Sequence, residues 1–151
     1  MKLTLDVVSI ERLVYHADDV DMVVVPGLEG VMGILPRHEP VISALRPGEI
    51  EIVRGDDREL LAIGGGFVEI RSPTVVVLAD GAEAADEIDV ARAEQARVRA
   101  RQRLEASPTE VDMERALAAL RRAEVRLTVA QRGRRRRQTQ PASSEGELSD
   151  R

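Results

Sequence analysis

Short apolar runs separated by turn residues fill the first half of the chain. The candidate strands are rich in Val, Ile and Leu and cover residues 3–10, 20–25, 41–45, 49–53, 59–63, 67–70 and 75–78. Turn signals stand between them: Pro26-Gly27, Arg46-Pro47-Gly48, Gly55-Asp56-Asp57, Gly64-Gly65-Gly66 and Arg71-Ser72-Pro73. Many short strands at this spacing predict an antiparallel β-sandwich or barrel over residues 1–84.

The pattern changes to helical spacing near Ala82. One apolar stripe runs through Val90, Ala93, Ala96, Ala100 and Leu104, and a second through Met113, Leu117, Leu120, Ala123, Leu127 and Ala130. Between them, Ser107-Pro108-Thr109-Glu110 reads as a capping box with Pro at the first helical position. Residues 85–132 are therefore predicted to form an antiparallel helical hairpin. Because alanine buries little apolar area, we expect the hairpin to be held weakly and to be able to detach.

Charge separates the chain into an acidic body and an arginine-rich arm. The net charge is −9 over residues 1–86, +2 over 87–132 and +2 over 133–151. Residues 133–151 begin with Gly133 and four arginines and continue with polar residues, so we predict a disordered tail. Such an arginine cluster can bind nucleic acid or anionic lipid, but a solvated tail near acidic protein surface is the favoured interpretation.

Several kinds of chemistry are poorly supported by the composition. Without cysteine there are no disulfides or thiolate metal sites, and His16 and His38 are too few and too far apart to suggest zinc. One Phe, one Tyr and no Trp leave little for base stacking, so nucleic acid is not an expected partner. No apolar run approaches the ~20 residues of a membrane helix, and no signal peptide is evident. We therefore expect a soluble, non-catalytic protein.

Five segments carry a resemblance to a known family, and they occur in one order. They are residues 23–30 (VVVPGLEG) with 33–40 (GILPRHEP), 45–48 (LRPG), 64–70 (GGGFVEI), 77–80 (VLAD) and 87–93 (EIDVARA). Together they resemble the epsilon subunit family of F-type ATP synthases over roughly residues 3–132. Arg37 and Glu39 stand where that family usually has Gly and Ala, so the contacts of this loop are expected to differ in detail.

The resemblance implies both an architecture and a set of partners. It implies an α+β fold, with an N-terminal sandwich of about ten strands that docks on the gamma subunit and the proton-driven c-ring. The hairpin would fold on the sandwich or extend into the alpha/beta catalytic head, where it inhibits ATP hydrolysis. The implied location is peripheral, on the cytoplasmic face of the bacterial plasma membrane. The rotor contacts implied for gamma and the c-ring are Glu29, Gly30, Val31, Met32 and His38.

A nucleotide site is also implied, because Ile88-Asp89-x-x-Arg92-Ala93 matches the family's ATP-binding motif. The full implied set is Glu83, Ile88, Asp89, Arg92, Ala93, Arg99, Arg122 and Arg126. Asp89 would accept a hydrogen bond from the adenine or the ribose, while Ile88 and Ala93 would pack on the base. ATP, with or without magnesium, would be a regulatory ligand, and no other cofactor is expected.

The spacing of these arginines suits that role. Arg92 and Arg99 share one face of the first helix, and Arg122 and Arg126 share one face of the second. Folding the hairpin would gather four guanidinium groups, and a triphosphate would relieve their repulsion and accept bidentate hydrogen bonds. The alternative is that they face solvent, since both helices are arginine-rich throughout.

Two other classes of function stay open at this point. A stand-alone ATP sensor would share the hairpin site but need no partner subunit. A nucleic-acid binder built on the arginine cluster is opposed by the acidic body and the scarcity of aromatic residues. An enzyme is the least supported class, because no nucleophile motif is present.

Overall fold

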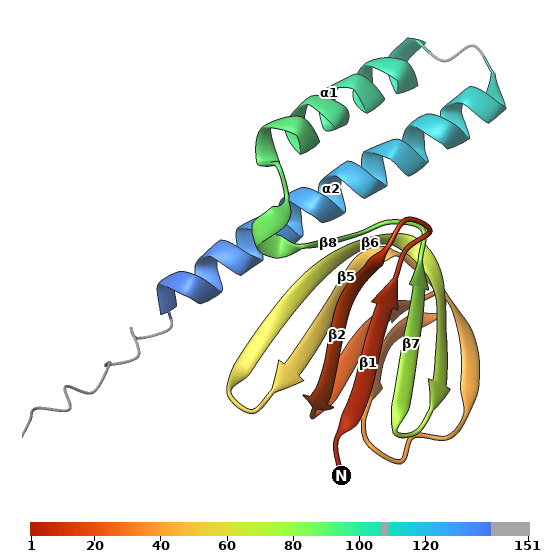
Figure 1. The fold of residues 1–151 in the computed structure, drawn as a ribbon. Coiled ribbons are helices and arrows are strands. Elements are labelled where there is room, and N and C mark those ends of the chain that lie inside the picture. Colours follow the sequence, from red (N-terminus) through yellow and green to blue (C-terminus); the bar gives the residue numbers. More distant parts are fainter. Residues whose placement is uncertain (107–108, 140–151) are drawn as a thin grey trace, which may run out of the picture.

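The computed structural model describes residues 1–106 and 109–139, in which a β-domain is followed by two helices (Figure 1). The strands are β1 (Leu3–Val8), β2 (Leu13–Val20), β3 (Met22–Gly27), β4 (Gly30–Ile34), β5 (Val41–Arg54), β6 (Asp57–Arg71), β7 (Thr74–Ala79) and β8 (Ala82–Ala84). A short 3-10 helix, η1 (Ala85–Glu87), leads into α1 (Val90–Ala106) and α2 (Glu110–Thr139). The predicted order, strands first and a helical hairpin second, is confirmed.

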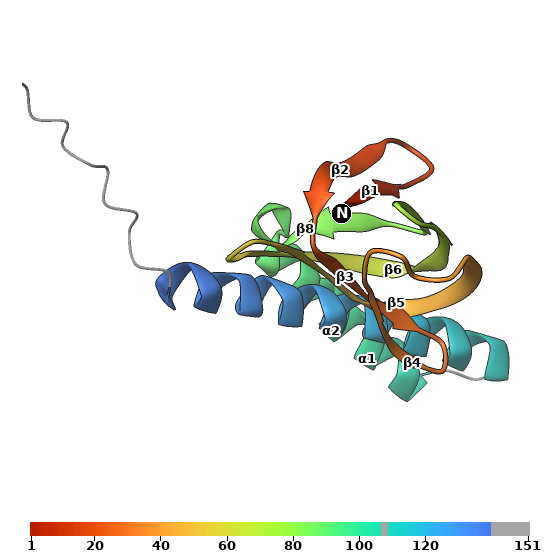
Figure 2. The same cartoon turned by 90° about the horizontal axis from the view of Figure 1, so that it is seen from below.

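All the described strands belong to one hydrogen-bonded sheet. Its order is β2-β1-β7-β6-β5-β3-β4, with β8 paired to β6, and the pairing is antiparallel except between β1 and β7. The long strands β5 and β6 curve together and fold the sheet over on itself (Figures 1 and 2). The enclosed core consists of aliphatic side chains such as Leu3, Leu5, Val25 and Ile34, as the composition requires.

The glycine run in β6 bends the strand and does not end it. Leu61 and Ile63 point into the core before the run, whereas Val68 and Ile70 do so after it, so the inward-facing parity changes there. Gly66 has a φ of 137°, and a Cβ at this position would lie 2.0 Å from the Leu78 carbonyl oxygen. Only glycine fits such a close approach of two backbones.

Strand β5 bends at the matching place, Arg46-Pro47-Gly48. Leu45 is buried before the bend, and Ile50 and Ile52 are buried after it. The predicted strand breaks at these two segments were therefore wrong, because each segment continues the pairing between β5 and β6. Since each bent strand contributes to both layers, the eight strands account for the roughly ten that the resemblance implies.

Three strands, β2, β4 and the three-residue β8, were missed from the sequence. Only Ala17 and Val20 are buried in β2, whereas His16, Asp18 and Asp19 are exposed, so no clear alternation marks this strand. The glycines at both ends of the short strand β4 made it look like a turn.

Both helices begin at side-chain caps. The Asp89 Oδ1 atom accepts a hydrogen bond from the Arg92 backbone N at 3.1 Å, and the Thr109 Oγ1 atom accepts one from the Asp112 backbone N at 3.1 Å. The second helix therefore starts at Glu110 with Thr109 as its cap, in place of the predicted Ser107, which lies outside the described residues. Thr109 and Asp112 offer the same hydroxyl-to-acid spacing two residues later.

Alanines spaced by seven residues form the contact between the helices. Ala93 and Ala100 of α1 and Ala116 and Ala123 of α2 are all buried. Ala130, the next in the series, is buried instead against Ile88 and the strand residues Leu60 and Ala62. The small alanine side chains between the helices let the helix axes approach, and larger side chains are displaced to the flanks. Met113 and Leu117, expected on the buried stripe, are accordingly exposed.

The second helix runs well beyond residue 132, to Thr139, where a disordered tail was expected. This expectation was wrong for residues 133–139, because they extend a helix that is held against the sandwich: Arg132 and Arg136 pair with Glu49 and Glu51 of β5. The rest of the predicted tail, residues 140–151, lies outside the described residues. Neither of the described helices is long and apolar enough to cross a membrane.

Candidate functional site

A cavity of about 770 Å³ lies where the hairpin meets the sandwich. Strand β6 and the segment from Asp80 to Glu83 form one side, α2 forms another, and the turn between β1 and β2 closes it. The residues of the two helices that line it are Ala96, Ala119, Arg122, Ala123 and Arg126. Its size is that of a small-molecule site, and it exists only while the hairpin is folded, because both the helices and the sandwich contribute walls.

Three residues of the predicted ATP site line this cavity: Glu83, Arg122 and Arg126. Arg126 donates from Nε and Nη2 to the Glu83 Oε2 atom at 3.2 and 3.1 Å, and both side chains are half-buried. Arg122 is exposed and extends over Gly64, where a Cβ would lie 3.5 Å from the Arg122 Cδ atom. No carboxylate of the described residues pairs with Arg122, so its guanidinium group is available to an anion in the cavity.

The remaining five predicted residues do not line the cavity. Ile88 packs in a cluster with Leu60, Ala62, Val129 and Ala130 at the base of the hairpin. Ala93 is fully buried between the helices, and Asp89 caps α1. Arg92 and Arg99 are exposed on α1. The cavity thus contains two of the four arginines that were expected to converge.

Apart from Glu83, sequence reasoning missed the sandwich side of the cavity. Glu11 and Arg12, from the turn between β1 and β2, and Asp80, after β7, all line it. Arg12 Nη2 also lies 3.6 Å from Glu87 Oε2 of η1 and so links this turn to the start of the hairpin. Nothing in the sequence places residue 12 beside residue 87, because that contact depends on the sheet order. The described residues contain no cluster of His, Asp and Glu that could hold a metal ion.

The predicted rotor contacts lie on the hairpin formed by β3 and β4 and on the loop after it. Val31 is 67% exposed at the start of β4, and Glu29 is exposed in the turn, while Gly30 and Met32 are half-buried. His38 is half-buried, and its Nδ1 atom lies 2.7 Å from the backbone oxygen of Glu39. This hydrogen bond orients the ring of His38 within its Pro-bounded loop.

An apolar row on the outside of the sandwich was not anticipated. Phe67 of β6 is paired with Leu78 of β7, and Ile42 lies on the same face of the neighbouring strand β5. These three side chains are 55%, 54% and 71% exposed, respectively. A row of large exposed apolar side chains is typical of a surface that contacts another protein.

Two family models together match almost the whole described chain. The ATP synthase delta/epsilon chain β-sandwich domain matches residues 2–85, and the delta/epsilon chain long α-helix domain matches residues 86–131. The chain therefore belongs to the delta/epsilon chain family of ATP synthases, and the family expected from the sequence is confirmed. The end of α2, from Arg132 onward, lies outside the matched segments.

Individual relatives agree with this assignment. The chain is 48% identical over 136 residues to the ATP synthase epsilon chain of Herpetosiphon aurantiacus, covering 90% of this chain and 99% of that protein. It is 43% identical to the epsilon chain of Desulforamulus reducens over 84% of this chain and 96% of that one. It also resembles a chain of the Euglena gracilis mitochondrial ATP synthase, with 25% identity, a TM-score of 0.71 and coverage of 82% and 78%.

Proposed function

We propose that this chain is the central-stalk epsilon subunit of a bacterial F-type ATP synthase. In this role it couples proton flow through the c-ring to ATP synthesis but performs no catalysis itself. Family membership over nearly the whole described chain supports this role, as does the likeness to a chain of a mitochondrial ATP synthase solved with its F1 part and c-ring. The partners are then the gamma subunit, the c-ring and the alpha/beta head, at the cytoplasmic face of the membrane.

Two surfaces of the sandwich are suited to contact the rotor, which consists of gamma and the c-ring. The tip of the β3–β4 hairpin exposes Val31 beside Glu29, and the row of Ile42, Phe67 and Leu78 offers a larger apolar area. Burying exposed apolar side chains contributes about 25 cal/mol per Å² of area removed from water. The sandwich is therefore the part that stays docked, while the weakly held hairpin is free to move.

The regulatory part of the proposal rests on one observation: the folded hairpin places Arg122 and Arg126 over a cavity shared with the sandwich. A triphosphate bound there contacts residues that come together only in the folded state. ATP then stabilises the folded hairpin by mass action and lowers the population that extends and inhibits hydrolysis. Arg122 has no carboxylate partner among the described residues, so its guanidinium group can bind the phosphates, and Arg126 can bind them once it releases Glu83.

Calorimetric titration of the full chain with ATP, with and without magnesium, tests the ligand. We expect one-to-one binding that weakens at least tenfold in the Arg122→Ala/Arg126→Ala double variant, because charged hydrogen bonds contribute about 1.5–3 kcal/mol each. The control is Arg101→Ala/Arg115→Ala, which removes the same charge from exposed positions outside the cavity. Equal weakening in both double variants, or no binding at about 1 mM ATP, would refute the nucleotide site.

Copurification tests the stalk role separately. A tagged chain expressed in its own bacterium should bring gamma and the c-ring with it. Recovery of the chain alone, with ATP binding intact, would instead favour the stand-alone ATP sensor.

A further inference from the structure

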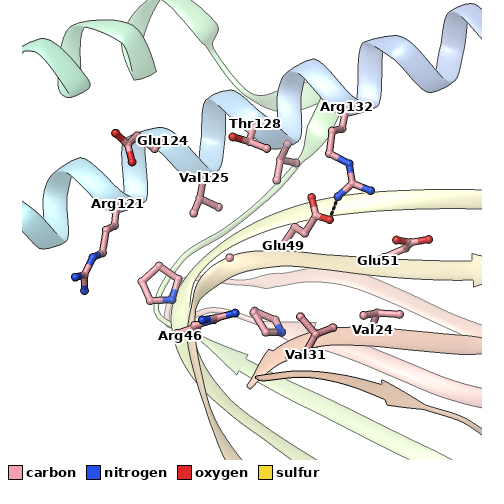
Figure 3. A pocket seen from close by; sticks show the side chains of 14 residues that line it. Val24, Val31, Arg46, Glu49, Glu51, Arg121, Glu124, Val125, Thr128 and Arg132 are labelled. Carbon is pink, nitrogen blue, oxygen red and sulfur yellow. Dashed lines mark ion pairs between the residues drawn. The ribbon is translucent and has the colours of Figure 1, made fainter. Parts of the chain in front are cut away.

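The last turns of α2 lie over an acidic part of β5. Arg132 forms an ion pair with Glu49, and the Arg136 Nη2 atom lies 3.4 Å from the Glu51 Oε1 atom (Figure 3 shows the first pair). Both carboxylates point outward, because Ile50 and Ile52 between and beyond them are buried in the core. Arg136, which belongs to the predicted solvated tail, is therefore in contact with the sandwich, as is Arg132 at the end of the predicted hairpin.

The spacings of the helix and the strand match at this contact. Residues four apart in an α-helix are separated by about 6 Å along the axis, and they lie on one face. Residues two apart in a β-strand are separated by about 6.6 Å, and they also lie on one face. Arg132 and Arg136 therefore meet Glu49 and Glu51 in parallel, with one ion pair for each turn of the helix.

These pairs are more sheltered than ordinary surface pairs. The Glu51 side chain is only 15% exposed, and its Oε1 atom also accepts from the Arg58 Nη1 atom at 2.6 Å. Gly133 lies between the two arginines in sequence, and a Cβ on it would come within 2.7 Å of the Ala85 Cβ atom. The absence of a side chain at residue 133 therefore lets α2 approach η1 closely enough for both pairs to form.

Direct packing on this side of α2 is interrupted by a second cavity. About 740 Å³ separates Val125 and Thr128 of α2 from Val24 and Val31 of the sheet, and the Arg132–Glu49 pair stands at its end (Figure 3). The apolar contact of α2 with the base of the hairpin and the sandwich comes from Val129 and Ala130, with Val125 at its edge, in one small cluster. The ion pairs beyond the cavity add to this small contact in holding α2 on the sandwich.

We propose that Arg132 and Arg136, with Glu49 and Glu51, form an electrostatic latch that holds the hairpin in its folded position. The latch is distinct from the nucleotide cavity, because its side chains come from other turns of α2 and from another strand. It rests on the proposed movement of the hairpin, and it adds a second control of that movement. Because salt screens such pairs, the hairpin opens more readily as ionic strength rises, with or without ATP.

Spin labels measure the opening in the full chain, which has no native cysteine. Asp56→Cys, in the turn between β5 and β6, and Glu105→Cys, near the end of α1, are both exposed and report the distance between sandwich and hairpin. The ratio of detached to folded populations is measured in about 50 mM and about 500 mM salt. The test variants are Arg132→Gln, Arg136→Gln and their combination, and the control is Arg134→Gln, an exposed arginine of the same segment.

In the lower salt, we expect each test substitution to raise the detached-to-folded ratio about two- to five-fold, and the double variant to lose most of its salt dependence. The exchange Glu49→Arg with Arg132→Glu should restore the wild-type ratio. An Arg134→Gln effect as large as that of Arg132→Gln, or an unchanged ratio in the double variant, would overturn the latch while leaving the proposed function in place. No detachment in any chain at either salt concentration would overturn the hairpin movement and the latch together.

Discussion

Arg126 of α2 and Glu83 of β8 form an ion pair in the wall of the cavity between hairpin and sandwich, with the Arg126 Nη2 atom 3.0 Å from the Glu83 Oε1 atom. The arginine that would meet a phosphate group therefore has a carboxylate partner when the cavity contains no anion. Such an arrangement avoids leaving a half-buried guanidinium group unpaired. In the proposed function, the same residue would therefore hold the folded hairpin in the absence of ATP and bind the nucleotide in its presence.

Substitution of Glu83 tests whether its ion pair with Arg126 holds the hairpin in the folded position. Glu83→Gln leaves Arg126 without its carboxylate, so we expect the detached-to-folded ratio of the hairpin to rise about two- to five-fold without ATP. The measurement is the spin-label distance described above. Glu69→Gln is the matched control, since its pair with Arg71 lies within β6 and touches neither helix. Equal ratios in the two variants would show that the Glu83 pair does not hold the hairpin.

The bend in β6 predicts a large effect at Gly66. In Gly66→Ala, the new Cβ clashes with the Leu78 carbonyl oxygen, and the backbone is held at a φ that disfavours alanine. We expect the free energy of unfolding to fall by about 3 kcal/mol or more, measured by urea denaturation.

Gly55→Ala is the control that distinguishes the steric clash at Gly66 from the conformational cost of placing alanine at a positive φ. Gly55 also has a positive φ, 57°, but nothing lies within 4 Å of its Cβ position. Gly55→Ala should therefore lower the free energy of unfolding by only about 1–2 kcal/mol. If Gly66→Ala lowered the free energy of unfolding no more than Gly55→Ala does, the close approach of β6 and β7 would be contradicted.

The local pattern of apolar and polar residues identifies most of the strands and both helices, but not the bends in β5 and β6. Strands β1, β3 and β7 follow from alternating or continuous aliphatic residues, and the hairpin follows from helical spacing. Gly64-Gly65-Gly66 marks either a turn or a bend, and only the pairing with β5 decides between them. The strand β2 could not be recognised because His16, Asp18 and Asp19 face solvent, an arrangement that a turn would also explain.

The candidate site is predictable only in part from the family resemblance. Glu83, Arg122 and Arg126 were identified because they occupy the places of an acid and of arginines in the family's ATP site, and they do line the cavity. The residues of the matched motif itself, 88–93, do not line it. Arg12 and Asp80 were not identified, because the sheet order that brings them there is a long-range property. The arginine run after residue 132 was misjudged for the same reason: Glu51, the partner of Arg136, is remote in sequence.

His16 gives the β1–β2 pair a dependence on pH. Its Nδ1 atom lies 2.6 Å from the Asp6 Oδ1 atom, and its Nε2 atom lies 3.3 Å from Asp18 Oδ1, so chiefly the hydrogen bond to Asp6 raises the pKa of His16. A histidine with a raised folded-state pKa contributes stability that is complete below its unfolded pKa, about 6.5. That contribution is lost as the pH rises through the folded-state pKa.

The expected outcome is a stability difference that depends on pH. The wild type should exceed His16→Gln in unfolding free energy at pH values below about 6.5, and the difference should shrink as the pH rises further. Urea denaturation across this range measures it, and Asp6→Asn should lower the pKa of His16 in an NMR titration. A constant difference between wild type and His16→Gln would show that the Asp6 contact is not coupled to protonation.

Gly133 provides the most discriminating test of how α2 is docked. Alanine favours a helix over glycine by about 1 kcal/mol, so Gly133→Ala should strengthen α2 when the hairpin is detached. In the folded position, however, the new Cβ would lie 2.7 Å from the Ala85 Cβ atom, and the helix must move away from η1. We expect helix content by circular dichroism to be kept or raised while the folded population falls.

Ala85→Gly in the same chain removes the opposing methyl group and should restore the folded population. If Gly133→Ala instead increased the folded population, helix propensity and not close contact with η1 would determine how the end of α2 is held.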